Sequence, residues 1–384
     1  MEIMRQTKLS NITNLFTVPY RKLVRKGIIK ALTVLFLILI FSFFFLVKQN
    51  FLFTTSMERE EEIEKCIDFI NMSMDLCLKH KDRSDQNKEF SRITTKLPLR
   101  PVKMTQTTAV FLYTGNGSQT IMKRVIVKHD SPSVEDIIAT KLKHPNIMET
   151  TKSFRRDYIT DREEHQELIW LFSEYLKQKI SQRFVNRDEN IIRKIVKDIL
   201  TAYIFIHKQH IVHLDMKIAN VMGQMDSNGN IIYKLIDFGY ARDLSKEENP
   251  EEIKIPNKSY GTFPYKPPET VFENIHGVKG DIWCLGCVAW FLSLGKTPFY
   301  LEDGEKNIES YKRFLRGKIK HFFREETSLE LRDFIIKCMK RDRELRPTAE
   351  ELMNHPFITG ETTIKYDSDV YSDDSGYESD SIST

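Results

Sequence analysis

The hydrophobic pattern of the chain changes once, between about residues 172 and 186, and this change constrains the fold more than any other feature. Before it, from about residue 95, short strand-like runs dominate: "AVFLYT", "IMKRVIVK" and "LIWLFSEY". After it, "NIIRKIVKDILTAYIFIH" has apolar residues at helical spacing, and further helical patterns follow up to "EELMNHPF". The sequence therefore predicts an α+β fold in which a small β-rich part precedes a larger helical part.

The length and the net charge of the chain limit its number of domains and the kinds of partner that it binds. A chain of 384 residues can hold one large domain or two small ones with tails, and its formal charge of +4 gives no reason to expect a nucleic-acid partner. Cys284-Leu-Gly-Cys287 has C-x-x-C spacing, but no second pair completes a metal site, so we expect core cysteines. The five cysteines form no visible disulfide framework, which favours a reducing compartment.

Residues 28–47, "IIKALTVLFLILIFSFFFLV", predict a transmembrane helix. Seventeen successive residues from Ala31 carry no charge, and twenty helical residues span about 30 Å, one hydrocarbon thickness. The alternatives are a buried soluble helix and a cleaved signal peptide, although the basic segment 1–27 is long for a signal peptide. We expect a single-pass membrane protein. Residues 48–94 then form a polar stalk with one amphipathic helix, or a loosely ordered linker.

Polar motifs follow one another in a fixed order through the two-part region. "VIVK" ends at Lys128, Glu135 opens a helical pattern, and "HPNI" begins at His144. "HIVHLDMKIANVM" then spans residues 210–222 and is followed by Asp237-Phe238-Gly239. "GTFPYKPPE" (261–269), "DIWCLG" (281–286) and Arg346-Pro347 complete the series. Each motif alone is a weak signal, but the ordered set over about residues 95–358 resembles the eukaryotic protein kinase family, of the serine/threonine type.

The resemblance implies a two-lobed kinase domain over residues 95–358 that uses ATP and Mg²⁺. In such a domain Lys128 would hold the α- and β-phosphates and Glu135 would pair with it, with Asp136 as the less favoured partner. "LFSEYL" resembles the hinge, where adenine would bond to the backbone of Glu174 and Leu176. Ser173 would then control access to the pocket behind the adenine.

The same resemblance assigns the catalytic residues. Asp215 would accept the proton of the substrate hydroxyl, and Lys217 would reach the transferred phosphate. Asn220 and Asp237 supply hard oxygen ligands suited to Mg²⁺. Thr262 would bridge Asp215 and Lys217, and both this threonine and Lys217 indicate protein substrates with Ser or Thr acceptors.

Two further pairs would be structural. Glu269 is expected to pair with Arg346 as a buried ion pair. Asp281 is expected to tie its helix to the backbone near His213.

The chain departs from the family at two places. "MTQTTA" (Met104–Ala109) stands where the glycine-rich loop is expected, and we assign Gly115 and Gly117 to the next hairpin turn. Leu214 replaces an arginine that normally meets a phosphate on the activation segment, which implies activity without that phosphate. An active kinase is the preferred interpretation, and a pseudokinase that acts as a binding or scaffold module is the alternative.

The side of the membrane stays open. Basic residues before the span and the acidic "MEREEEIE" after it favour a lumenal or extracellular kinase domain. The supply of ATP and the cysteine usage favour the cytosol.

The C-terminal segment 359–384 is acidic and rich in serine, so we expect a disordered tail. Asp374-Ser375-Gly376-Tyr377-Glu378-Ser379 resembles a degron that a ubiquitin ligase reads once Ser375 and Ser379 are phosphorylated. A solubilising tail with no such role is the alternative.

Overall fold

A computed structural model of the chain describes residues 63–68, 70–71, 98–105, 107–127, 133–159, 165–180, 188–255, 260–295, 308–317 and 323–361. The chain divides into two compact units, Met1–Pro98 and Leu99–Thr384. In the first unit, residues 63–68 and 70–71 are helical, as their apolar spacing predicts, and Cys66, Ile67 and Ile70 are buried. The role of residues 48–94 as a stalk stays a prediction.

The predicted membrane span lies outside the described residues. The same holds for the basic segment 1–27 and for residues 362–384 of the acidic tail. Within the described ranges, no helix combines the length and the apolar character that a membrane crossing requires.

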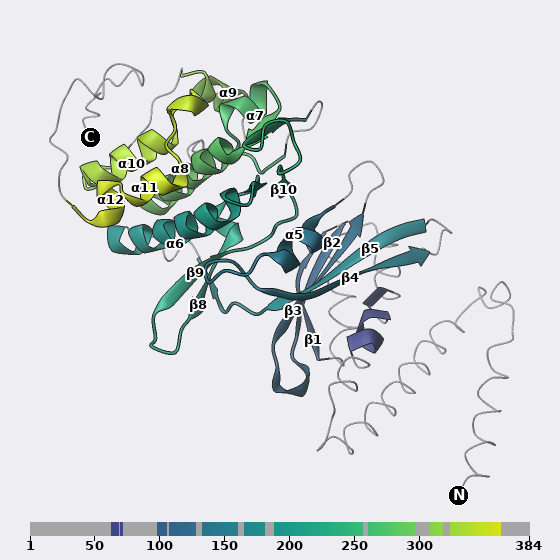
Figure 1. The fold of residues 1–384 in the computed structure, drawn as a ribbon. Helices are drawn as coiled ribbons and strands as arrows, with labels where there is room; N and C mark the ends of the chain where they lie inside the picture. Colours follow the sequence, from purple (N-terminus) through teal and green to yellow (C-terminus); the bar gives the residue numbers. More distant parts are fainter. Residues whose placement is uncertain are drawn as a thin grey trace, which may run out of the picture. The chain divides into compact units, whose positions relative to one another are not determined.

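The second unit begins with an antiparallel sheet of five strands in the order β1-β2-β3-β5-β4, drawn in blue in Figure 1. The strands are β1 (Leu99–Met104), β2 (Thr108–Tyr113), β3 (Thr120–Val127), β4 (Thr150–Ile159) and β5 (His165–Glu174). The helix α5 (Glu135–Lys141) packs on this sheet, where Ala139 meets Ile169 and Leu171. β5 lies between β3 and β4 in this sheet and has a continuous buried run from Leu168 to Phe172.

The larger part is built around two long helices, α6 (Glu189–His207) and α8 (Val278–Leu294). Asp188 caps α6 by accepting a hydrogen bond from the backbone N–H of Asn190. The predicted apolar face of α6 is buried, and α8 is apolar on all sides because other helices surround it. The other helices are α7 (Pro268–Phe272), α9 (Ile308–Leu315), α10 (Leu329–Cys338), α11 (Ala349–Met353) and α12 (Pro356–Thr359), shown in green to yellow in Figure 1.

Three small sheets lie in the same part. They join β6 (Gln178–Lys179), β8 (Val221–Met225) and β9 (Ile231–Leu235); β7 (Ile211–Val212) and β10 (Arg242–Asp243); and β11 (Glu252–Lys254) and β12 (Ile275–Gly277). The predicted α+β fold, with a β-rich N-terminal lobe and a helical C-terminal lobe, is confirmed. The thiols of Cys284 and Cys287 are buried within α8, as expected of core cysteines.

Candidate active site

Asp281 on α8 holds the loop between β7 and the 3₁₀ helix η4 (Ile218–Asn220) in place. The carboxylate of Asp281 is fully buried and accepts hydrogen bonds from the backbone N–H groups of His213 and Leu214, both at 2.9 Å. His207 Nε2 on α6 lies 3.0 Å from the same carboxylate. The expected tie between Asp281 and the backbone near His213 is therefore confirmed, and it connects the loop to both long helices.

Asp215 stands at the centre of a closed hydrogen-bond network. Thr262 Oγ1 donates to Asp215 Oδ1 at 2.6 Å, and Lys217 Nζ lies 2.6 Å from Oδ2. Lys217 Nζ also donates to Thr262 Oγ1 at 2.7 Å, so Thr262 bridges the two residues as the sequence predicts. Asn220 Nδ2 donates to the Asp215 carbonyl at 2.8 Å. These donors hold the carboxylate in one orientation at the surface of a pocket.

A second cluster joins the two lobes. Lys123 Nζ on β3 lies 2.5 Å from Glu135 Oε1 on α5 and 2.6 Å from Asp237 Oδ1, which follows β9. Gly239 lies beside this cluster, and a Cβ there would be 3.3 Å from Asp237 Oδ1 and 3.4 Å from Glu135 Oε2, so a side chain at this position would crowd the two carboxylates slightly. Lys123 and Asp237, which are 114 positions apart in the sequence, thus meet in one ion pair.

This geometry corrects the expected pairing, because the partner of Glu135 is Lys123 and not Lys128. Alternation along β3 gives the physical reason, since successive side chains point to opposite faces. Val125 and Val127 pack against the cluster that contains Ala139 of α5, and Lys123 shares their parity. Lys128 follows the last residue of β3 in the sequence and lies outside the described residues. The similarity of "VIVK" to a family motif therefore pointed to the wrong lysine.

Burial and charge act in opposite directions within the Lys123 cluster. Burial favours the neutral amine, but the carboxylates of Asp237 and Glu135 outweigh it and raise the pKa of Lys123. The ammonium in turn lowers the pKa of Asp237 despite its burial. Burial raises the pKa of Glu135, against the effect of Lys123. The cluster therefore keeps a cation beside an ionised Asp237 at neutral pH.

Asn220 and Asp237 have the ligand atoms that a divalent metal needs. The amide nitrogen of Asn220 is used by the Asp215 carbonyl, which leaves Oδ1 directed elsewhere. Lys123 contacts Oδ1 of Asp237, so Oδ2 remains as a second hard oxygen. Carboxylate and amide oxygens suit Mg²⁺. The two predicted metal ligands thus fit such an ion chemically.

The predicted hinge, residues 171–176, begins within the last residues of β5 and continues beyond its end at Glu174. Ser173 is buried, and its Oγ lies 3.0 Å from Thr150 Oγ1 on β4. The Glu174 carboxylate accepts hydrogen bonds from Lys234 Nζ at 2.6 Å and from the backbone N–H of Glu149 at 2.7 Å. Leu176 is buried. The side chains of this segment are therefore fixed in place, and the bonding of adenine to its backbone stays a prediction.

In the glycine-free stretch Met104–Ala109, Met104 ends β1 and Thr108 begins β2, so the turn between the two strands lies within this stretch. Thr105 Oγ1 accepts from the backbone N–H of Thr108 at 3.0 Å and donates to its carbonyl at 3.1 Å. Gly115 and Gly117 lie in the 3₁₀ turn η2 (Gly115–Gly117) between β2 and β3, which confirms their assignment to the next hairpin. A threonine side chain thus closes the turn where the family would place glycine.

Leu214 anchors the segment that follows Asp237 by apolar contacts. It is buried with Val212 and Leu244, and Ile253 and Tyr260 pack against this group. Leu214 adopts a left-handed backbone conformation with φ of 64°, which the two N–H bonds to Asp281 help to hold. Arg242 lies over the ring of Tyr260, with its Cζ 4.6 Å from the ring centroid. An apolar and aromatic cluster therefore surrounds Leu214, which replaces the arginine that resemblance to the family associates with a phosphate on this segment.

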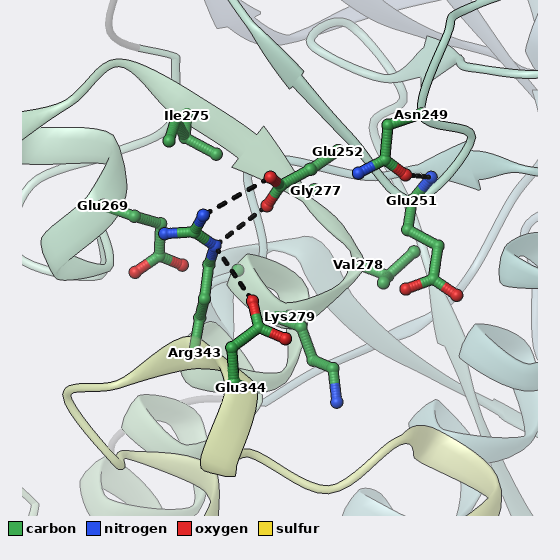
Figure 2. Close-up of a pocket in the computed structure, with 11 residues that line it drawn as sticks. Asn249, Glu251, Glu252, Glu269, Ile275, Gly277, Val278, Lys279, Arg343 and Glu344 are labelled. Carbon is green, nitrogen blue, oxygen red and sulfur yellow. Dashed lines mark hydrogen bonds and ion pairs between the residues drawn. The ribbon is translucent and has the colours of Figure 1, made fainter.

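Figure 2 shows a second pocket, where side chains of the segment after Asp237 meet side chains of the helical lobe. Arg343 of the 3₁₀ helix η5 (Arg343–Leu345) points between carboxylates, with Nε 2.9 Å from Glu252 Oε2 on β11 and 3.5 Å from Glu344 Oε1. Because these groups are partly exposed, the pair adds little to stability. Its structural effect is to fix where β11 lies.

Glu269, which also borders this pocket, forms the expected ion pair with Arg346. Arg346 Nη1 and Nη2 lie 2.6 and 2.8 Å from the two Glu269 oxygens, and both side chains are buried. Arg346 also donates to the carbonyls of Lys340 and Lys279, and its guanidinium lies over the ring of Trp283. The pair is fully hydrogen-bonded, as a buried charge pair must be.

Sequence reasoning missed two residues of this region. Asp136 forms a bidentate pair with Arg155 of β4, with both contacts at 2.8 Å, and holds α5 against the sheet. Lys266 lies in the pocket that contains Asp215 and Thr262. Asp136 was weighed only as a partner for the nucleotide lysine, and Lys266 carries no signal within "GTFPYKPPE".

Comparison with known proteins agrees with this geometry. A family model described as the protein kinase domain matches residues 108–358, which is more than half of the chain. A probable serine/threonine-protein kinase mkcD of Dictyostelium discoideum is 31% identical over 226 residues, covering 58% of this chain and 32% of that protein. The MAP kinase kinase kinase wis4 of Schizosaccharomyces pombe is 33% identical over 238 residues, covering 59% and 16%. Sperm motility kinase 2B of Mus musculus is 36% identical over 172 residues, covering 44% and 32%.

The chain spans about a third or less of the length of these three relatives. The family model, however, covers residues 108–358, which include Lys123, Glu135, Asp237 and the network of Asp215, Lys217 and Thr262. The chain belongs to the protein kinase family.

Proposed function

We propose that the chain is an active kinase that transfers the γ-phosphate of ATP to serine and threonine hydroxyls of proteins. The observation that carries this proposal is the closed network of Asp215, Lys217 and Thr262. Such a network orients a carboxylate toward an incoming hydroxyl and places a cation beside it. The names of the relatives, which include serine/threonine kinases, agree with this acceptor class.

Phosphoryl transfer depends on positioning and on the neutralisation of charge. Asp215 accepts the proton of the substrate hydroxyl as the bond from that oxygen to the γ-phosphorus forms and the bond from this phosphorus to the leaving ADP breaks. Lys217, 2.6 Å from Asp215 Oδ2, is near enough to contact the transferred group as well. Thr262 keeps both residues in register.

The nucleotide is held by the second cluster. Lys123 contacts phosphate oxygens while Glu135 keeps the ammonium in position. Asn220 and Asp237 would hold Mg²⁺, which neutralises phosphate charge when it is bound. The adenine bonds to the backbone of Glu174 and Leu176.

Phosphate transfer from labelled ATP tests the proposal directly. The full-length chain is incubated with Mg²⁺ and a generic protein substrate, beside the variants Asp215→Asn and Asp226→Asn. Asp226 is an exposed residue of the β8–β9 loop, and asparagine keeps the acceptor for the N–H groups of Asn228 and Asn230. We expect transfer by the wild type and by Asp226→Asn, and loss of at least about a hundredfold in Asp215→Asn.

Because the stretch Met104–Ala109 contains no glycine, one outcome of this experiment decides between an active kinase and a pseudokinase. A folded wild type that binds ATP without any transfer would favour the pseudokinase alternative, in which the domain serves as a binding module. Folding is checked by circular dichroism and by the thermal midpoint.

We further propose that residues 28–47 anchor the chain in a membrane as a single span. The support is the uncharged run from Ala31 and its length of one hydrocarbon thickness. Retention in the membrane pellet after alkaline extraction would support the anchor, and release into the supernatant would refute it. Protection of the C-terminal tail from added protease in sealed vesicles decides between the lumenal and the cytosolic side.

Recognition of phosphorylated Ser375 and Ser379 by a ubiquitin ligase stays a prediction from the tail sequence. Ser375→Ala should lengthen the half-life of the chain in cells. An unchanged half-life would remove the degron hypothesis, and the recognition also requires a cytosolic tail.

A further inference from the structure

Tyr260 is separated by a single residue from Thr262, whose hydroxyl bridges the carboxylate and the ammonium of the transfer network. The residue between them, Gly261, has a φ of 91°, and a Cβ there would lie 2.8 Å from the carbonyl oxygen of Leu214. Only glycine lets the chain pass so close to this carbonyl. The position of the Tyr260 side chain therefore bears directly on where the Thr262 hydroxyl lies.

The ring of Tyr260 is held by side chains from three places in the chain. Cζ of Arg242 on β10 lies 4.6 Å from the ring centroid, within the range of a cation–π contact. His276 on β12 meets the ring in a T-shaped arrangement at 5.3 Å, and the ring of Tyr240 lies 5.7 Å away. Aromatic pairs of this kind stabilise a structure beyond the area that they bury. All three contacts converge on the ring of Tyr260.

Two partners of this ring belong to paired strands. Arg242 pairs with Val212 of β7, the strand that leads into the loop of Asp215. His276 is buried and pairs with Ile253 of β11. The ring of Tyr260 therefore packs against side chains whose backbone is already fixed by strand pairing.

Tyr260 also packs against the apolar cluster that contains Leu214. The backbone N–H of Leu214 donates to the buried carboxylate of Asp281 at 2.9 Å, so this leucine is itself anchored to α8. The same residue supplies the carbonyl that Gly261 passes. Leu214 thus supports the chain at two adjacent points, Tyr260 and Gly261, directly before Thr262.

We propose that Tyr260 is a positioning residue for phosphate transfer, whose aromatic ring keeps Thr262 in the bridge between Asp215 and Lys217. Tyr260 acts through Thr262 and not on the reacting atoms. Transfer depends on this orientation, since a misplacement of about 1 Å can cost about a hundredfold in rate. The contacts described above all involve the ring, so the role requires an aromatic side chain and not its hydroxyl. The inference rests on the proposed kinase function and names what holds the same site in order.

The experiment compares Tyr260→Leu and Tyr260→Phe in the full-length chain, with labelled ATP, Mg²⁺ and a generic protein substrate. Leucine keeps an apolar side chain beside the Leu214 cluster but loses the aromatic contacts with Arg242 and His276. Its kcat should fall about five- to fiftyfold. The KM for ATP should stay within about twofold of the wild type, because the Lys123 cluster is unchanged. Phenylalanine keeps the ring and should retain at least about half of the wild-type kcat.

A double-mutant cycle separates positioning from a general loss of structure. Thr262→Ala removes the bridge itself, so adding Tyr260→Leu should lower kcat by at most about twofold further. A general loss of structure would give the same factor in both backgrounds. Arg242→Gln provides a second variant if Tyr260→Leu does not fold. It removes the cation over the ring and should lower kcat about threefold, again without further effect in the Thr262→Ala background.

Arg316→Gln is the matched control, because it removes a similar contact, with Cζ 4.9 Å from the ring centroid of Phe272, outside the pocket that contains Asp215. It should keep the wild-type kcat. A wild-type kcat in Tyr260→Leu, an equal loss in Tyr260→Phe, or an undiminished effect in the Thr262→Ala background would overturn the inference and leave the kinase function standing. Absence of transfer by the wild type would contradict the kinase function itself, and this inference with it.

Discussion

Glu135 Oε1 lies 2.5 Å from Lys123 Nζ, so the first residue of α5 is joined to the centre of β3. Asp237 Oδ1 lies 2.6 Å from the same ammonium, so Lys123 contacts a carboxylate from each lobe. Removal of this cation would leave the carboxylates of Glu135 and Asp237 without the ammonium that pairs with both. The position of the phosphates therefore depends on Lys123.

Lys123→Met should lower phosphate transfer at least about a hundredfold, because the variant loses the only cation in the described part of this cluster. Lys128→Met is the matched control and should keep most of the wild-type rate. The measurement is kcat/KM for ATP in the full-length chain. The opposite ranking of the two variants would restore the assignment from the "VIVK" motif.

A different contact sets the orientation of α5. Asp136 binds Arg155 in a bidentate pair at 2.8 Å, while Arg155 also donates to the carbonyl of Ser133 at 2.9 Å. Arg155→Gln should therefore raise the KM for ATP and lower kcat/KM about tenfold, because Glu135 on the same helix turn would lose its fixed position.

Glu167→Gln is the control for this prediction. Glu167 contacts Arg155 at 3.2 Å on the exposed side, so its removal leaves the bond to Asp136 intact. Its kinetics should match the wild type. Asp136→Asn and Arg155→Gln should also show non-additive effects when combined, since both remove one interaction; additive losses would contradict the positioning role.

Much of this site could be predicted from the sequence because its residues are grouped in short motifs. Asp215, Lys217 and Asn220 lie within six residues, and the chain geometry of one loop brings them together. Thr262 and Asp281 also belong to contiguous motifs whose order resembles the family. The two lobes followed from the change of hydrophobic period alone.

The errors and omissions have a physical reason as well. The choice between Lys123 and Lys128 depends on which face of β3 meets α5, and only the pairing of β3 with its neighbours fixes that face. The contact of Asp136 with Arg155 spans 19 residues and has no local signature. Lys266 borders a pocket together with Leu214 and Gly261, and Gly261 lies close to the carbonyl oxygen of Leu214. These residues are brought together by the fold and have no shared sequence motif.

The ion pair of Glu269 and Arg346 gives a prediction about stability. Both side chains are buried, and loss of one partner leaves the other charge without compensation. Glu269→Gln should lower the free energy of unfolding by about 3 to 5 kcal/mol. Glu350→Gln is the control, since its contact with Lys208 is exposed and 3.9 Å long, and it should change stability by at most about 1 kcal/mol. Urea unfolding measures both variants; similar losses in the two would refute the role of burial.

The last prediction concerns pH and the C-terminal helices. Asp333 on α10 accepts from His355 Nε2 at 2.9 Å and lies 2.8 Å from Lys337 Nζ. Burial opposes the charge of Asp333, but the hydrogen bonds from His355 and Lys337 outweigh it and lower its pKa below the ordinary 3.8. A lowered pKa in the folded state stabilises the protein above the ordinary value, and this contribution is lost as the pH falls through the folded-state pKa.

Asp333→Asn should therefore unfold about 1 kcal/mol more easily than the wild type at neutral pH. The difference should stay nearly constant down to about pH 5 and shrink at lower pH, as the wild-type carboxylate takes up a proton. The shrinking difference reports protonation of the Asp333 carboxylate. Urea unfolding at several pH values measures this curve, and a difference that grows toward acid would contradict the lowered pKa.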